Sequence, residues 1–261
     1  LVASFNFDSN TNDSATNYSN TLSSYNTATY STSDFIRGSA AATFNGTNCF
    51  YITNNDFRFT PAELTIAVWI KPALGGTAAY QSIATCREAV SPFTNLKGWT
   101  IYINPSNKLE VTTGGNSSPW SGAESSAAVP TFVDGVWTHL AITLSRTTNS
   151  LSVYTNGVFR ETTTRSYAST TSTSTPMRIA SGGDNATPEF FFKNGSLMDD
   201  FRFYNRILTQ TEISNIYSGS ISNNTNITLS DIGICSYTTS NPGPIEHVTM
   251  NLAVDALPSF S

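Results

Sequence analysis

The sequence predicts an all-β fold of two antiparallel sheets packed as a jelly-roll sandwich. Short runs of β-branched and aromatic residues recur about every ten residues, with turn residues between them, which is typical of this architecture. Apolar residues make up 39% of the 261 residues, enough for one large core. The predicted strands are Leu1–Phe7, Ala40–Phe44, Phe50–Thr53, Leu64–Lys71, Gln81–Cys86, Gly98–Ile103, Lys108–Thr113, Trp137–Leu144, Ser150–Thr155, Met177–Ala180 and Leu197–Tyr204.

Two antiparallel hairpins follow from their turn residues. Trp99–Ile103 reverses through Asn104–Asn107 into Leu109–Val111, and Trp137–Leu144 reverses over a polar turn into Leu151–Tyr154. Asn, Pro and Ser favour tight reversals because they fix φ or bond to the backbone. Each pair is therefore expected to lie side by side in one sheet.

The last predicted strand is followed by the one clear helix signal. Along the strand, Phe201 and Phe203 alternate with polar positions, as a strand with one covered face requires. Thr209 and Glu212 then have the spacing of a capping box. Ile213, Ile216 and Tyr217 fall on one helical face, so one short helix is expected to close the domain.

The composition changes after Gly219, where a polar stretch leads into two further β-like runs. We therefore predict a sandwich domain over residues 1–219 and a linker or accessory β segment over 220–261. Three roles stay open for this second segment: a linker to another domain, an extra hairpin, or a strand offered to a neighbouring subunit.

The low charge indicates an extracellular setting and excludes two partner classes. Charged residues are only 12% of the chain, and Ser, Thr and Asn carry most of its polarity, which favours a secreted protein, a cell surface or a virion surface. The net charge of −5 and the pI of about 4.9 argue against nucleic-acid binding. No apolar run approaches the roughly 18 residues of a membrane span, so membrane insertion is not expected. The chain begins without Met, which indicates a mature product or an excised domain.

The chain carries sequons for N-glycosylation, although its Asn, Ser and Thr content would produce a comparable number by chance. A second polar region, Thr162–Thr164 and Ser169–Thr175, is interpreted either as a site of O-glycans or as a polar loop or edge. The sequon asparagines are Asn12, Asn17, Asn45, Asn116, Asn185, Asn194, Asn223 and Asn226.

The three cysteines, Cys49, Cys86 and Cys235, cannot all pair within one chain. In an oxidising compartment we expect one disulfide and one odd thiol. Cys49 and Cys86 are the preferred pair because both lie in the predicted main domain. Their spacing excludes a C-x-x-C redox or metal motif.

Several segments, in order, resemble the laminin-G-like domains of the concanavalin A-like lectin and glucanase superfamily over about residues 1–219. Each motif is loose, but their ordered occurrence is fairly specific. The resemblance implies a two-sheet sandwich fold. The matching segments are Ala41–Gly46 with Cys49–Ile52, Leu64–Pro72, Asp134–Ala141, Tyr154–Gly157 and Met198–Leu208.

The resemblance also implies a role for three large side chains. Trp69, Trp137 and His139 occupy framework positions of the family, where such residues lie in the core with their N–H groups bonded to backbone. The competing interpretation is that they line a sugar site.

Asp199 and Asp200 start the closing strand, and because adjacent strand residues face opposite ways, at most one is expected on the core side. In many sandwiches of the resembling superfamily the residue equivalent to Asp199 holds a structural Ca²⁺. Here Asp8 and the Asn45–Gly46 turn are the proposed partners, since calcium takes oxygen ligands.

An ion pair is the alternative for Asp199, with Arg202, Arg206 or Arg37 as its partner, because a buried carboxylate needs a compensating charge or donors. Asp200 is expected to be solvated or paired with an arginine.

No enzyme signature is found, so the chain is predicted not to be an enzyme. The E-x-D-x-x-E strand of the resembling family-16 glycoside hydrolases, which aims paired carboxylates into one groove, does not occur. The strings of alginate-lyase-like jelly rolls are missing too. Only His139 and His247 could serve a histidine-based relay, and His139 is assigned to the framework.

Ligand candidates are side chains in loops that no core position explains. Trp120 is the first choice, because a Trp in a Gly/Ser loop offers a flat face to a sugar ring, although it could instead fold back as a lid on its own sheet. Asn116 shares this loop. Asp184, beside Asn185 in a Gly-rich loop, could add polar contacts, and Tyr80 and Tyr102 are further candidates.

The predicted function is a non-catalytic recognition or adhesion module whose partner is a glycan or an extracellular protein. The alternative is a structural subunit of a surface fibre or virion that assembles through residues 220–261. A polysaccharide hydrolase or lyase comes third.

Overall fold

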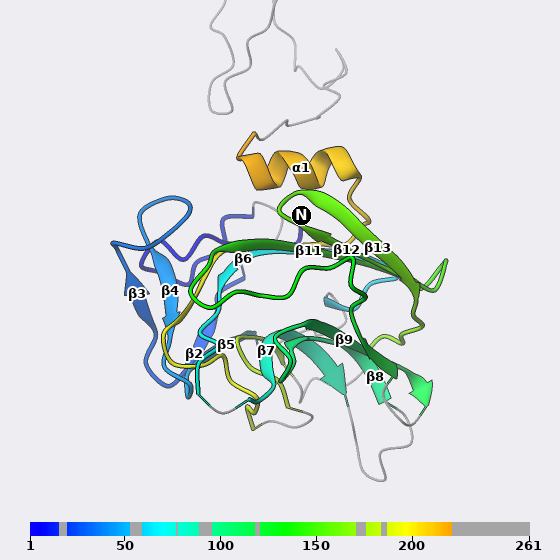
Figure 1. Ribbon diagram of the computed structural model, residues 1–261, viewed down its shortest axis with the longest axis horizontal. Helices are drawn as coiled ribbons and strands as arrows, with labels where there is room; N and C mark the ends of the chain where they lie inside the picture. Colours follow the sequence, from blue (N-terminus) through cyan, green and yellow to red (C-terminus); the bar gives the residue numbers. More distant parts are fainter. Residues whose placement is uncertain are drawn as a thin grey trace, which may run out of the picture. The chain divides into compact units, whose positions relative to one another are not determined.

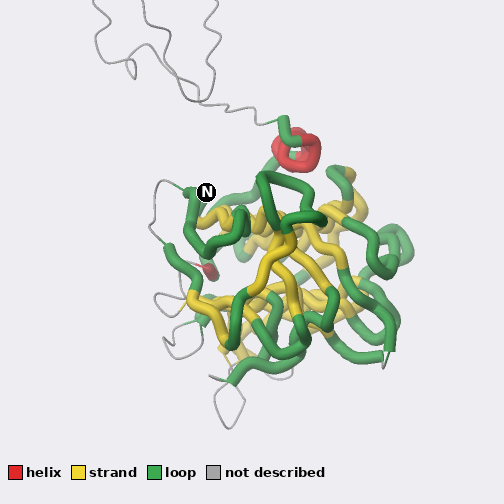
Figure 2. Tube along the Cα trace, turned by 90° about the vertical axis from the view of Figure 1, so that its left-hand side faces the viewer, coloured by secondary structure: helices red, strands yellow, loops and turns green. Residues whose placement is uncertain are grey.

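The computed structural model confirms a sandwich of two antiparallel sheets that face each other across one core (Figure 1). The view turned by 90° shows the same two layers of strands, with the helix outside them (Figure 2). The structure describes residues 1–15, 20–52, 59–76, 78–88, 96–117, 121–170, 176–183 and 187–220.

The first sheet has eight strands and runs in the order β13-β12-β11-β6-β15-β4-β3, with β1 paired to β15. Its long central strands are alternating or continuous apolar runs, which suits strands covered on both faces. The strands are β1 (Ala3–Phe5), β3 (Thr29–Ser31), β4 (Ala41–Phe44), β6 (Glu63–Lys71), β11 (Thr138–Ser145), β12 (Ser150–Thr155), β13 (Val158–Thr164) and β15 (Ser196–Tyr204).

The second sheet has seven strands in the order β10-β9-β8-β7-β14-β5-β2. Its strands are β2 (Ser23–Tyr25), β5 (Cys49–Ile52), β7 (Gln81–Glu88), β8 (Leu96–Ile103), β9 (Leu109–Ser117), β10 (Ser121–Glu124) and β14 (Met177–Ile179).

Each predicted strand corresponds to an observed one, and both predicted hairpins are present as β8–β9 and β11–β12. Four of the described strands were not predicted from the sequence: β2, β3, β10 and β13. They are rich in Ser, Thr and Gly, and all four are edge strands of their sheets. Edge strands bury little side-chain surface, so they need no apolar alternation and leave little signal.

Helix α1 (Gln210–Ser218) closes the described part of the chain, as predicted. Thr209 caps it: its side chain accepts from the N–H of Glu212, and the Glu212 side chain accepts from the N–H of Thr209. The helix covers the outer face of the eight-stranded sheet (Figure 1). Ile213 and Ile216 pack there against residues of β6, β11, β12 and β15, which forms a second, smaller apolar cluster.

The predicted disulfide is wrong, because Cys49 and Cys86 are not joined to each other. Strand β14 lies between β5 and β7, so the two cysteines stand two strand positions apart, about 9.5 Å. A disulfide usually needs Cα atoms within about 7 Å. Both side chains are buried, and burial raises the pKa of the Cys49 thiol to about 11.

Residues up to Ser220 form one compact unit. The predicted boundary near residue 219 and the roles considered for 220–261 stay predictions, because residues 221–261 lie outside the described chain. Cys235 lies there too. Within the described residues, no helix has the length and apolar character to cross a membrane.

Candidate functional site

The outer face of the seven-stranded sheet carries polar and aromatic side chains. Ile101 and Ile103 of β8 and Leu109 of β9 belong to the core, so by strand alternation Tyr102 and Glu110 point to the other face. These two residues are cross-strand partners. The strand period therefore places both on the surface of the sheet that faces away from the core.

An aromatic cluster of Tyr80, Tyr102 and Phe190 lies on this face. The ring centroids are 5.4 Å apart for Tyr80 and Tyr102, 5.9 Å for Tyr102 and Phe190, and 6.4 Å for Tyr80 and Phe190, all edge to face. Tyr80 is 38% exposed and Phe190 is 43% exposed, whereas Tyr102 is buried beneath them. Two rings are thus held in place with their surfaces open to solvent.

Polar groups surround the cluster. The Tyr80 hydroxyl donates to Glu110 Oε2 at 3.1 Å, and Arg87 Nη1 donates to the Tyr102 hydroxyl at 2.9 Å. Asn104 Nδ2 also donates to Glu110 Oε2, at 3.5 Å. The site thus offers the half-buried carboxylate of Glu110 next to the exposed rings, while the buried side chains of Asn104 and Arg87 hold Glu110 and Tyr102.

The backbone fixes the Phe190 ring in position. The Ser82 N–H donates to the Phe190 carbonyl at 2.8 Å, and Gly182 and Glu189 exchange two backbone hydrogen bonds. A side chain at Gly182 would press on Phe190, Ser82 and Tyr102, so the glycine gives these groups room. The cluster is therefore built in advance of any ligand.

The predicted ligand residues do not all meet. Tyr80 is part of the cluster, whereas Asn116 is exposed on β9, six residues beyond Glu110, or roughly 20 Å along the strand. Trp120 and Asp184 lie outside the described residues. The sequence missed Arg87, Glu110 and Phe190, which lies exposed in a loop. Tyr80 and Tyr102 were the signals in the sequence that pointed to this site.

Asp199 and Asp200 are both buried, at 0% and 3% exposure, and Asp199 is the cross-strand partner of Trp69, which lies beneath α1. The register along β6 moves two residues, from Trp69 to Ala67, while β15 moves three, from Asp199 to Arg202. This is a β-bulge, and Asp200 takes a left-handed φ of 49° within it. The bulge breaks the alternation of the strand, so Asp200 lies buried beside Asp199, with Arg37 and Arg202 as its partners.

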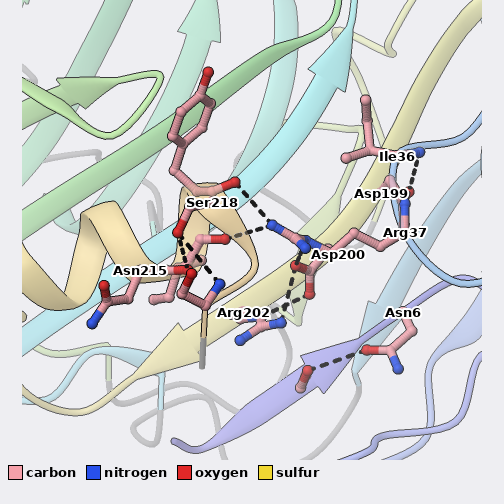
Figure 3. Close-up of polar contacts among 12 residues, drawn as sticks. Asn6, Ile36, Arg37, Asp199, Asp200, Arg202, Asn215 and Ser218 are labelled. Carbon is pink, nitrogen blue, oxygen red and sulfur yellow. Dashed lines mark hydrogen bonds and ion pairs between the residues drawn. The ribbon is translucent and has the colours of Figure 1, made fainter. Parts of the chain in front are cut away.

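Asp200, rather than Asp199, makes the ion pairs (Figure 3). Its oxygens lie 2.7 Å and 3.0 Å from Arg202 Nε and Nη2, and 3.1 Å from Arg37 Nε. Arg37 Nη2 also donates to the carbonyls of Ile216 and Tyr217, at 2.7 Å and 2.9 Å. Asp200 is thus the anchor of an arginine that caps the C-terminal end of α1, where a cation is favourable.

Asp199 holds the loop before β4. Its Oδ2 accepts from the N–H groups of Ile36 and Arg37, both at 2.8 Å (Figure 3). Its Oδ1 is buried and has no hydrogen-bond partner among the described residues. Burial raises the pKa of this carboxyl from 3.8 to about 6, against the two backbone donors.

The predicted calcium ligands are not assembled. Asp8 Oδ1 accepts from Ser39 and Ala40, at the end of the loop that Asp199 holds. Asn45 Oδ1 accepts from Thr47 and Asn48 in its own turn. The register of β4 and β15 sets Asn45 four residues from the level of Asp199, about 13 Å away, too far to share one ion. In the part of the chain that the structure describes, no three His, Cys, Asp or Glu side chains group as a metal site. Calcium binding stays a prediction that these residues do not fit.

Trp69 and His139 lie beneath α1. Trp69 stacks on Tyr217 at 5.4 Å and contacts His139 edge to face at 5.3 Å. Burial, with the charges of Arg37 and Arg202, lowers the pKa of His139 from 6.5 to about 3. Trp137 is half-buried, and its Nε1 donates to Asp34 Oδ1 at 2.8 Å. The helix leaves no open sugar site at Trp69 and His139.

Four sequon asparagines, Asn12, Asn45, Asn116 and Asn194, are exposed. Asn17, Asn185, Asn223 and Asn226 lie outside the described residues. Glycosylation at any of them stays a prediction.

The family model described as the concanavalin A-like lectin/glucanases superfamily matches residues 44–214. No curated protein matches the chain significantly. Among solved structures, the binding domain of Paraclostridial mosquitocidal protein 1 superposes with a TM-score of 0.62 at 15% identity, covering 84% of this chain and 52% of that one.

Two structures of the binding domain of botulinum neurotoxin DC, one in complex with SialylT and one with rat synaptotagmin II, give TM-scores of 0.58 and 0.59. Both are 15% identical and cover 84% of this chain and 51% of the other. The chain thus spans about half the length of these proteins, and the likeness is one of fold.

Proposed function

Because the chain belongs to the concanavalin A-like lectin/glucanases superfamily, we propose that it is a glycan-binding recognition module of a secreted or surface-displayed protein. The observation that carries the proposal is the aromatic cluster of Tyr80, Tyr102 and Phe190. Exposed rings bind the C–H face of a sugar, while neighbouring polar groups bind its hydroxyls. Glu110 stands where such a group is needed, held by Tyr80 and Asn104.

The solved structures support a glycan or a protein as partner. One binding domain of similar fold is described in complex with SialylT and another with rat synaptotagmin II. The low identity and the half-length coverage mean that these ligands suggest a class only. Glycan is the first choice here because the cluster combines exposed rings with hydrogen-bonding groups.

A glycan array probed with the purified chain and with Tyr80→Ala tests the proposal. Losing a stacking ring should weaken binding by about two- to twelvefold, since such a contact contributes about 0.5–1.5 kcal/mol. Phe159→Ala is the matched control, because Phe159 is 48% exposed on β13, in the other sheet. Equal binding by Tyr80→Ala and the unchanged chain would mean that the glycan does not bind at this cluster. Trp120→Ala would then test the Gly/Ser loop, which the sequence analysis preferred as the site.

One observation favours a second candidate, a polysaccharide hydrolase. The backbone register pairs Glu110 of β9 with Glu124 of β10, and opposite residues in an antiparallel pair have Cα atoms within about 5.5 Å. Retaining glycosidases use a pair of carboxylic residues, which is the residue type that this register brings together. The sequence could not show this pairing, because the two residues lie on different strands.

We nevertheless propose binding without catalysis, since Glu110 is already bonded by Tyr80 and Asn104. The chain is incubated with polysaccharides that it binds, and a reducing-end assay then distinguishes a binding module from a hydrolase. Release of new ends by the unchanged chain, lost in Glu110→Gln, would establish the hydrolase. The absence of new ends with glycans that the chain binds is the expected result.

A further inference from the structure

We propose that a crevice between the two sheets is a second binding site, and that it takes a small aliphatic amino acid of the leucine type. The crevice lies at the sandwich edge formed by β9, β12 and β13, and its volume is about 130 Å³. It shares no residue with the aromatic cluster, so the proposal does not depend on the glycan-binding function.

The floor of the crevice is aliphatic. Leu109 and Val111 of β9 face Leu151 and Val153 of β12, and all four are at most 4% exposed. A volume of this size corresponds to roughly four water molecules. It suits a branched aliphatic side chain and is too small for a long acyl chain.

The mouth of the crevice is polar although it belongs to the inner side of a sheet. Thr163 and Glu161 of β13 are the cross-strand partners of Leu151 and Val153, so they share the inward face with these core residues. Inward positions of a sandwich are normally apolar. Two polar residues there require partners.

Three polar atoms at the crevice lack those partners. Ser125 Oγ, Thr163 Oγ1 and Arg165 Nε are buried, and none has a hydrogen-bond partner in the described segments. Each buried polar group left unsatisfied destabilises the folded protein. A polar ligand head in the crevice would supply the missing hydrogen bonds.

The charges at the mouth select the head group. Arg165 offers Nε to a carboxylate. Within the described residues, the Glu161 carboxylate accepts hydrogen bonds from the Ser126 N–H alone, at 3.1 Å and 3.3 Å to its two oxygens. It therefore keeps lone pairs for an ammonium group. A plain carboxylate would meet repulsion from Glu161 and a plain amine repulsion from Arg165. A zwitterion satisfies both charges, and its aliphatic side chain covers the floor.

The crevice is a poor sugar site, because no aromatic side chain is among the described residues that line it. The competing explanation is edge protection. An inward charge on an edge strand such as β13 discourages pairing with another chain and needs no ligand. These two explanations differ in what they predict for binding.

Titration calorimetry on the full chain with L-leucine, 4-methylpentanoate and 3-methylbutylamine tests the proposal. The last two ligands lack the ammonium and the carboxylate, respectively, and glycine lacks the side chain. We expect leucine to bind, and each of the other three to bind at least tenfold more weakly. Failure of leucine to bind, or equal binding by 4-methylpentanoate, would overturn the proposal and leave edge protection as the role of Glu161.

Arg165→Gln should weaken leucine and 4-methylpentanoate at least tenfold and should strengthen 3-methylbutylamine, because the repulsion between Arg165 and the amine is removed. Arg160→Gln is the control, since Arg160 lies on β13, the strand that ends just before Arg165, and its Nε bonds to Thr155 Oγ1 outside the crevice lining. A melting curve by circular dichroism shows whether each variant is folded, and the ligand series on the unchanged chain decides the matter if Arg165→Gln is not. Tyr80→Ala should bind leucine normally, which separates this site from the proposed glycan site.

Discussion

At the scale of single residues, two adjacent aspartates have different tasks. Asp200 joins Arg37 and Arg202, while Asp199 accepts two backbone N–H groups of the loop before β4. Both carboxylates are buried, so each depends on its own set of partners. The pair therefore organises the outer face of the eight-stranded sheet around α1.

Arg37→Leu should lower the free energy of unfolding by about 2 kcal/mol, because it leaves a buried carboxylate with one partner fewer and removes the cap of α1. Urea unfolding measures the change. Arg206→Leu is the control: its ion pair with Glu212 is exposed, so its loss should cost less than about 1 kcal/mol. Equal effects of the two substitutions would contradict the role assigned to Arg37.

Asp199→Asn should stabilise the protein at neutral pH. The raised pKa means that the folded state favours the protonated carboxyl, so ionisation above pH 6 costs up to about 3 kcal/mol, a cost that disappears as the pH falls below 3.8. The variant should thus be more stable at pH 7.5 and equal to the unchanged chain near pH 4. Urea unfolding across this range tests the trend.

His139→Gln gives the opposite trend. The pKa of His139 is lowered from 6.5 to about 3, so the unchanged chain loses stability as the pH falls through 6.5, while the variant does not. Its advantage should therefore grow with acidification. Parallel pH profiles of the two variants would contradict the assigned pKa directions.

Calcium should leave the melting temperature unchanged within error. Asp8, Asp199 and Asn45 bond to different backbone groups and do not form one oxygen shell. A bound ion would stabilise the folded state according to its concentration and affinity. Melting curves in EDTA and in added calcium make the comparison, and a rise with calcium would restore the predicted site.

At the scale of elements, the ends of strands and helices carry the strongest local signals. The capping box at Thr209 was readable from the sequence and is present in α1. Edge strand β13 combines Val and Phe with Thr and charged residues, and it was not predicted because its outer positions meet solvent. An element can thus be predicted from neighbouring residues where its side chains must bond to unpaired backbone groups or bury one face of the element.

Thr209→Ala should lower the free energy of unfolding by about 1 kcal/mol, since it removes the acceptor for the Glu212 N–H. The matched control is Thr211→Ala, an exposed position within the helix, where alanine should change stability by no more than about 0.5 kcal/mol in the stabilising direction. Chemical unfolding followed by circular dichroism checks both. A Thr209→Ala variant as stable as the control would argue against the cap.

At the scale of the whole molecule, the sandwich has two different outer faces. Helix α1 covers the eight-stranded sheet through Ile213 and Ile216, whereas the seven-stranded sheet presents Tyr80 and Phe190 to solvent. The covered face stabilises the fold, and the other face is open to a ligand. This division places the proposed glycan site on the seven-stranded sheet.

A chain ending at Ser220 should keep its melting temperature within a few degrees, because the described core lies within residues 1–220. Differential scanning calorimetry of the short and full chains tests this. Size-exclusion chromatography of the same pair tests the alternative of a structural subunit: a larger assembly formed only by the full chain would support it.

The sequence by itself determined the strand runs, both hairpins and the capped helix, because period-2 burial, turn residues and caps act over a few neighbouring residues. Tertiary structure decided which distant residues meet. Strand order separates Cys49 from Cys86, and a bulge buries Asp200 beside Asp199. The cluster of Tyr80, Tyr102 and Phe190 likewise depends on strand register and a loop path. Such contacts follow from how whole strands pair, which no short pattern in the chain encodes.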